Sequence, residues 1–120
     1  MKHLIILSIL VLAGSALANT PPEVTNAVAV QRPHSATIDV NFDVADVDGD
    51  NVNISLWYSI DAGISWDNQC VSISGDEGPG IMPASGLTVT WEAGIDLPDF
   101  ALHEISIRVF ADDSTVNLNQ

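Results

Sequence analysis

The chain has 120 residues and carries 16 Asp and Glu against 3 Lys and Arg, which gives a formal net charge of −13. A surface this acidic repels nucleic-acid phosphates and anionic lipid headgroups, so it argues against both classes of partner. The charge suits solubility outside the cell, or binding of cations, and the partner that we expect is an extracellular protein or carbohydrate.

Residues 1–18 have the pattern of a secretory signal that is cleaved on export. A charged start precedes an apolar run over residues 4–13, and residues 16–18 (A-L-A) have the small-residue form that signal peptidases cut. The apolar run is shorter than the ~20 residues that a membrane-spanning helix needs, which disfavours a retained anchor. We therefore expect secretion to the periplasm, cell surface or medium, no membrane insertion after cleavage, and a single mature domain over residues 19–120.

Apolar and polar residues alternate in several stretches of the mature chain, as in strands with one buried face. Turn-forming residues separate these stretches at the spacing of an antiparallel β-sandwich, and no stretch has helical periodicity. We predict strands near residues 24–31, 36–43, 52–60, 69–74, 87–92 and 104–111, with a weak last strand at 116–118. The predicted core takes one parity from each strand: Val40, Phe42, Ile54, Leu56, Tyr58, Val89, Trp91, Ile105, Ile107 and Val109.

Cys70 is the only cysteine of the chain, so no internal disulfide can form. Stability must therefore come from packing or from bound metal. A thiol covered on a short strand is favoured over a reactive or intermolecularly paired one.

Residues Ser59–Trp66 (SIDAGISW) match the Asp-box pattern S-x-D-x-G-x-[ST]-W, which recurs in the blades of sialidase-type propellers. In such a hairpin Asp61 accepts backbone N–H groups across the turn, Gly63 takes positive φ, and Trp66 folds back over the loop. The pattern is a folding device without a catalytic part. A propeller needs several blades, which a chain of this length cannot supply.

The segment Asp43–Asp50 (DVADVDGD) places four carboxylates within eight residues. Calcium takes six to eight oxygen ligands, so this density suits it. An EF-hand is excluded because, counting from Asp46, Asn51 stands at the glycine position and Trp57 at the bidentate-acid position. The spacing instead resembles the D-x-D-G-D turn of cadherin-like and related bacterial surface domains.

In a sandwich of this strand order, the loop after the strand near 36–43 and the loop after the strand near 104–111 lie at the same end. The sequence therefore predicts a calcium site in which Asp46, Asp48 and Asp50 are joined by Asp112 or Asp113. The alternative is a solvated acidic turn whose aspartates cap their own backbone, and the sequence leaves both interpretations open.

No catalytic residue is predicted, because the chain lacks a G-x-S-x-G elbow, a phosphate-cradling glycine loop and any His or Cys spacing for zinc. Pairs among Asp76, Glu77, Asp96 and Asp99 could serve as a general acid and base. Loops rich in acidic residues form such pairs by chance, so an enzyme is the weaker hypothesis.

Five segments together resemble a known module: Val40–Asp50, Ser55–Trp66, Ser72–Gly80, Val89–Asp96 and Ile107–Asp113. The module is a fibronectin type III or immunoglobulin-like domain of secreted bacterial proteins, often placed before a formylglycine-generating (sulfatase-modifying) domain. The resemblance implies an accessory β-sandwich with a binding or spacer role and no catalysis of its own. The alternative is that the chain is the non-catalytic N-terminal part of a secreted enzyme of that type.

Overall fold

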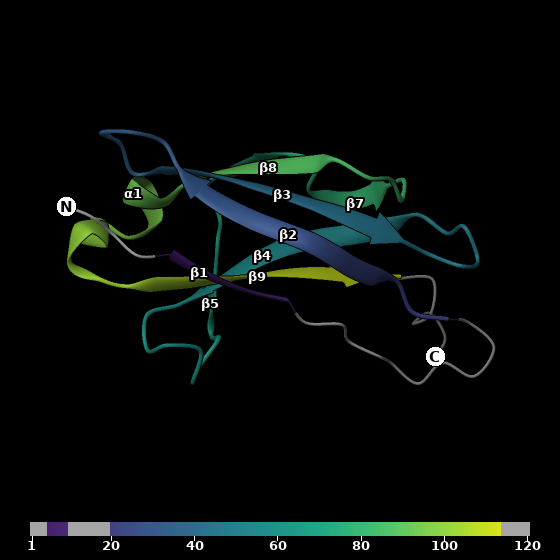
Figure 1. Ribbon diagram of the computed structural model, residues 1–120, viewed down its shortest axis with the longest axis horizontal. Coiled ribbons are helices and arrows are strands. Elements are labelled where there is room, and N and C mark those ends of the chain that lie inside the picture. Colours follow the sequence, from purple (N-terminus) through teal and green to yellow (C-terminus); the bar gives the residue numbers. More distant parts are fainter. Residues whose placement is uncertain (1–4, 10–19, 114–120) are drawn as a thin grey trace.

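The computed structural model describes the backbone of residues 5–9 and 20–113, and the side chains of residues 20–113 (Figure 1). The predicted cleavage site at residues 16–18 and the predicted strand at 116–118 lie outside the described residues. The elements in chain order are β1 (Ile5–Ile9), β2 (Glu23–Gln31), β3 (Thr37–Ala45), β4 (Val52–Ser59), β5 (Asn68–Gln69), β6 (Ile73–Gly75), β7 (Gly78–Ile81), β8 (Leu87–Glu92), α1 (Ala93–Asp96), the 3-10 helix η1 (Phe100–Leu102) and β9 (Ile105–Asp112).

The strands form two sheets, which confirms the predicted all-β class (Figure 1). One sheet has the order β2-β3-β8-β6, and the other has the order β1-β9-β4-β5 with β7 also paired to β4. Every described strand pair is antiparallel except β1 with β9, which is parallel. No helix in the described part of the chain is long and apolar enough to cross a membrane.

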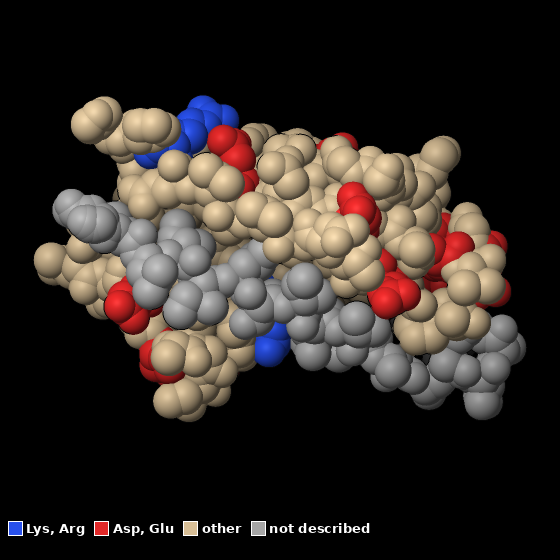
Figure 2. Space-filling view, viewed as in Figure 1, with Lys and Arg blue, Asp and Glu red and all other residues tan. Residues whose placement is uncertain are grey.

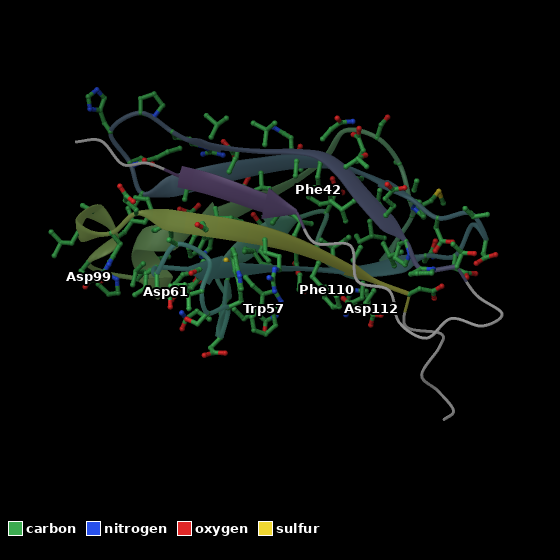
Figure 3. The ribbon with its side chains drawn as sticks, turned by 60° about the horizontal axis from the view of Figure 1, so that its bottom comes forward. Phe42, Trp57, Asp61, Asp99, Phe110 and Asp112 are labelled. Atoms are coloured by element: carbon green, nitrogen blue, oxygen red, sulfur yellow. The ribbon has the colours of Figure 1, made fainter. Side chains whose placement is uncertain are left out.

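The core lies between the two sheets and contains every residue that the alternation predicted. Tyr58 of β4 meets Trp91 of β8 across this core, with ring centroids 5.0 Å apart. On the other face of the β9–β4 sheet, Trp57 stands opposite Arg108 and both stay partly exposed (Figure 3). The predicted register is therefore confirmed, because a slip of one residue would have exchanged these two faces.

The predicted strand at residues 69–74 is wrong in one respect, since it is two short strands in different sheets. The Cys70 N–H donates to the Leu56 carbonyl of β4 at 2.9 Å, whereas β6 pairs with β8. The chain crosses between the sheets at Val71 and Ser72, where the Asp96 carboxylate accepts both backbone N–H groups. At this crossing the Asp96 carboxylate thus takes the place of a neighbouring strand as the hydrogen-bond acceptor. Apolar–polar alternation alone cannot reveal such a contact, because Asp96 is distant in sequence.

Three further elements within residues 20–113 were not predicted. β7 has the sequence GPGI, whose glycines and proline indicate a turn, yet it pairs with the edge of β4. Both α1 and η1 are too short to show helical periodicity. β4 ends at Ser59, where the Asp-box loop begins, so Ile60 leaves the alternation and is 42% exposed.

β1 falls inside the segment predicted as a signal peptide. It runs parallel to β9, with Ile5 opposite Ile105 and Ile9 opposite Val109. It also lies beside β2 of the other sheet, so it closes one side of the molecule between β9 and β2 (Figure 1).

Candidate metal centre

The acidic loop begins where β3 ends at Ala45. Asp46 Oδ1 accepts the Asp48 N–H at 2.8 Å, and the Gly49 N–H donates to the Asp46 carbonyl at 2.9 Å. Gly49 has φ +75°, a conformation that favours glycine. Asp46 therefore caps its own turn with one carboxylate oxygen, as the solvated-turn interpretation predicted, and its second oxygen takes no part in the turn.

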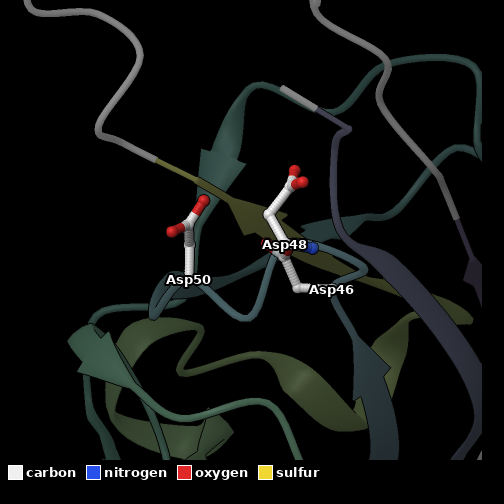
Figure 4. Close-up of side chains that lie close together, drawn as sticks. All are labelled: Asp46, Asp48 and Asp50. Carbon is white, nitrogen blue, oxygen red and sulfur yellow. The ribbon is translucent and has the colours of Figure 1, made fainter. Parts of the chain in front are cut away.

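Three carboxylates of this loop converge. One oxygen from each of Asp46, Asp48 and Asp50 lies within 4.8 Å of the others (Figure 4). Asp46 and Asp50 are partly buried, whereas Asp48 is exposed and accepts the Thr20 N–H at 2.8 Å. Acidic side chains gather at this end of the face shown in Figure 2, on the right, where the loop between β3 and β4 lies in Figure 1.

The end of β9 supplies a fourth carboxylate. Asp113 is only 3% exposed, and its carboxyl group is hydrogen-bonded to that of Asp50. Asp112 stands opposite Asn53 in β9 and is exposed (Figure 3), and neither Asp112 nor Asp113 belongs to the group of three converging loop carboxylates. Of the two residues proposed from the sequence, Asp113, which directly follows β9, is the one that contacts the loop through Asp50, because neighbouring residues at a strand end point in opposite directions.

The electrostatics of the cluster are unfavourable without a bridging proton or cation. Partial burial, the hydrogen bond with Asp113, and repulsion by Asp113, Asp46 and Asp48 together raise the pKa of Asp50. Two carboxyl groups hydrogen-bond to each other only if one of them carries a proton. In addition, Asp46 Oδ2 is buried and, among the described residues, has no hydrogen-bond donor.

Asp43, the first carboxylate of the acidic segment, serves the fold instead. Its Oδ1 accepts the Gly86 N–H and its Oδ2 accepts the Asn26 side-chain amide, both at 2.8 Å. These two hydrogen bonds, from Asn26 first and from Gly86 second, lower the pKa of Asp43. Asp43 is therefore committed to holding β2 and the β7–β8 connection against β3.

The Asp-box loop has the local geometry that its pattern predicted. Asp61 accepts the Ser65 N–H at 2.9 Å and the Ser65 hydroxyl at 2.6 Å, and it also accepts the Ser59 hydroxyl. The hydrogen bonds from Ser59 and Ser65 lower the pKa of Asp61 to about 2. Gly63 has φ +87°, Trp66 lies over it, and the Arg108 guanidinium lies 4.3 Å from the centre of the Trp66 ring.

Three of the four acidic residues considered as a general acid and base, Asp76, Asp96 and Asp99, have local hydrogen-bond partners. Asp96 accepts the Trp91 indole N–H at 2.8 Å as well as two backbone N–H groups and the Ser72 hydroxyl. Although burial acts to raise it, these hydrogen bonds lower the pKa of Asp96. Asp76 accepts the Thr88 N–H at 2.9 Å, and Asp99 lies 3.1 Å from His103.

The structure also shows which features the sequence pattern could not reveal. Asp96 anchors the crossing between the sheets, and no spacing rule links it to Val71 or Ser72. No family model matches the chain, and neither a curated protein nor a solved structure does. The function therefore has to be inferred from the geometry of the site itself.

Proposed function

We propose that the chain is a non-catalytic extracellular module of immunoglobulin-like type, with a binding or spacer role towards a protein or carbohydrate, and that calcium stabilises it. The observation that carries the calcium part is the buried Asp46 Oδ2, which has no donor among the described residues and stands beside the Asp48 and Asp50 carboxylates. A buried carboxylate oxygen without a donor or counter-ion costs free energy, and a bound cation removes that cost.

The strand order supports the immunoglobulin-like part of the proposal. In constant-type immunoglobulin domains one sheet has the order A-B-E-D and the other contains C, F and G. With β2, β3, β4, β6, β8 and β9 taken as A to F, the first sheet here has that A-B-E-D order, and F pairs with C in the second sheet. Strand G of such a domain lies next to F, on the side away from C. Here β1 occupies that place, next to β9 and on the side away from β4.

The positions of the four carboxylates support calcium as the stabilising ion. Asp46, Asp48 and Asp50 follow β3 of one sheet, whereas Asp113 follows β9 of the other. An ion shared by both sets would join the two sheets at this end. Calcium accepts six to eight oxygens in flexible geometry, while magnesium demands a tighter octahedron, so an aspartate loop favours calcium.

Thermal unfolding with and without calcium tests the proposal. Binding to the folded state alone stabilises by about 1.4 kcal/mol at roughly ten times Kd. For a domain of this size such a gain raises Tm by about 5–10 °C. We expect this rise in millimolar calcium relative to chelator, and a much smaller rise in magnesium.

A matched pair of variants separates the site from general screening of acidic charge. Asp50→Asn removes a carboxylate of the cluster and should abolish most of the calcium-dependent rise in Tm. Asp112→Asn removes the same charge from the exposed side of β9 and should leave the rise intact. An equal response of both variants, or an equal response to calcium and magnesium, would leave only a solvated acidic turn.

A further inference from the structure

We propose that the outer edge of β9, over Ile105–Val109, is a strand-accepting site for an extended, apolar segment of another polypeptide. This inference rests on the proposed binding role and names the surface that performs it. The recognition would be strand addition, in which main-chain hydrogen bonds supply affinity and alternate side-chain positions supply specificity.

The edge already accepts such a strand within this chain. The five residues Ile5–Ile9 pair with the five residues Ile105–Val109 in an unbroken parallel register. Leu7 stands opposite Ile107 at the centre of this ladder. The occupant is short, uncharged and apolar at its first, third and fifth positions.

The occupied edge borders the core. The positions opposite Ile5, Leu7 and Ile9 are Ile105, Ile107 and Val109, each of which is at most 1% exposed with β1 in place. β1 also lies beside β2, so it lies at the side of the molecule where β9 of one sheet and β2 of the other come close together. A strand at this place therefore extends the β9 ladder next to three core positions of β9.

Export would empty this edge. The sequence predicts that residues 1–18 are cleaved, and β1 lies within them. Among the described residues only β1 pairs with this edge of β9, so without β1 the outward N–H and C=O groups of Ile105–Val109 would have no partner within residues 20–113. Open edges of this kind pair readily with other chains.

The chemistry of the occupant follows from that of β1 and from the charge of the chain. An apolar strand without acidic residues matches the edge, since it repeats what the ladder already holds. A second copy of the chain is disfavoured, because all 16 acidic residues lie within residues 19–120, and two such acidic domains would have to meet edge to edge. The partner is therefore a different polypeptide, neutral or basic around an alternating apolar segment of about five residues.

Hydrogen–deuterium exchange on the full-length chain tests the site. Leu7→Pro removes a backbone N–H from β1 and disfavours a strand there, whereas Leu7→Ala keeps the strand. We expect those amides of residues 105–109 that point towards β1 to exchange at least tenfold faster in the Pro variant than in the Ala variant, whereas the alternate amides stay paired with β4. A synthetic peptide with the sequence of residues 3–11, extended by terminal lysines for solubility, should restore the slow exchange. The same peptide with Pro in place of Leu7 should not.

A second measurement covers the case in which the Pro variant fails to fold. An excess of the peptide added to the unsubstituted chain should displace β1, so that residues 5–9 lose protection while residues 105–109 keep it. The proposal is overturned if the peptide changes the exchange of neither segment. It is also overturned if raising the concentration of the Pro variant alone protects residues 105–109, since a second copy would then occupy the edge. Calcium-dependent melting of the same protein would persist in either case, so failure here is distinguishable from failure of the proposed function.

Discussion

Truncating one buried valine and one exposed valine of the same sheet should give very different losses of stability. Val89 in β8 is 0% exposed and stands opposite Val40, whereas Val30 in β2 is 54% exposed. Val→Ala removes two methyl groups, worth about 1.6 kcal/mol of transfer free energy in a fully buried site. A residual cavity adds about 24 cal/mol per Å³, so Val89→Ala should cost roughly 2–3 kcal/mol. Val30→Ala should cost about 1 kcal/mol or less.

Urea unfolding followed by tryptophan fluorescence measures both losses on one scale. The lower strand propensity of alanine affects both variants, so their difference isolates burial. We expect Val89→Ala to be the less stable by about 1–2 kcal/mol, with unchanged m-values. A larger loss for Val30→Ala would mean that the strand faces are reversed and the register is wrong, and equal losses would contradict the difference in burial.

Three other results are expected. In urea unfolding, Gly75→Ala should lose at least roughly 2 kcal/mol more stability than Gly86→Ala. Both glycines have positive φ, but of the two only Gly75 would place an added Cβ against a backbone oxygen, at 2.5 Å. Equal losses of stability would contradict this. Since the pKa of Asp61 falls from 3.8 to about 2 on folding, its carboxylate stabilises above about pH 4 and ceases to do so as the pH falls through 2. The stability gap between wild type and Asp61→Asn should therefore be wide at pH 6 and narrow at pH 2, and a constant gap would exclude the hydrogen-bonded carboxylate as its cause. Burial raises the pKa of the Cys70 thiol, so Ellman's reagent should react at the rate of unfolding, and prompt labelling of native protein would show the site to be open.

The sheet faces could be predicted from the sequence because burial on one side imposes a period of two. Val40, Phe42, Leu56 and Ile107 belong to stretches with clean alternation, and all four are buried. Ser106 shows where the rule fails. It belongs to the outward parity of β9, but it stands opposite Ser59 at the start of the Asp-box loop and is buried.

The candidate metal site was predictable in its local part and less so in its distant part. Asp46, Asp48 and Asp50 are close in sequence, so a single turn brings their carboxylates together. The choice between Asp112 and Asp113 depended on where β9 ends and which way its last side chains point. The parallel pairing of residues 5–9 with β9 has no local signal at all, because an apolar run is equally typical of a secretory signal.

Calcium titration by calorimetry tests the central claim most directly, with Asp46→Asn and Asp112→Asn as the matched variants. In the Asp46→Asn variant the side-chain amide oxygen can still accept the Asp48 N–H, so this variant keeps the turn and loses the second carboxylate oxygen. The account predicts one calcium per chain with Kd of about 10⁻⁴–10⁻³ M, at least tenfold weaker binding for Asp46→Asn, and unchanged binding for Asp112→Asn. No saturable binding up to several millimolar calcium, or the same loss in both variants, would contradict it.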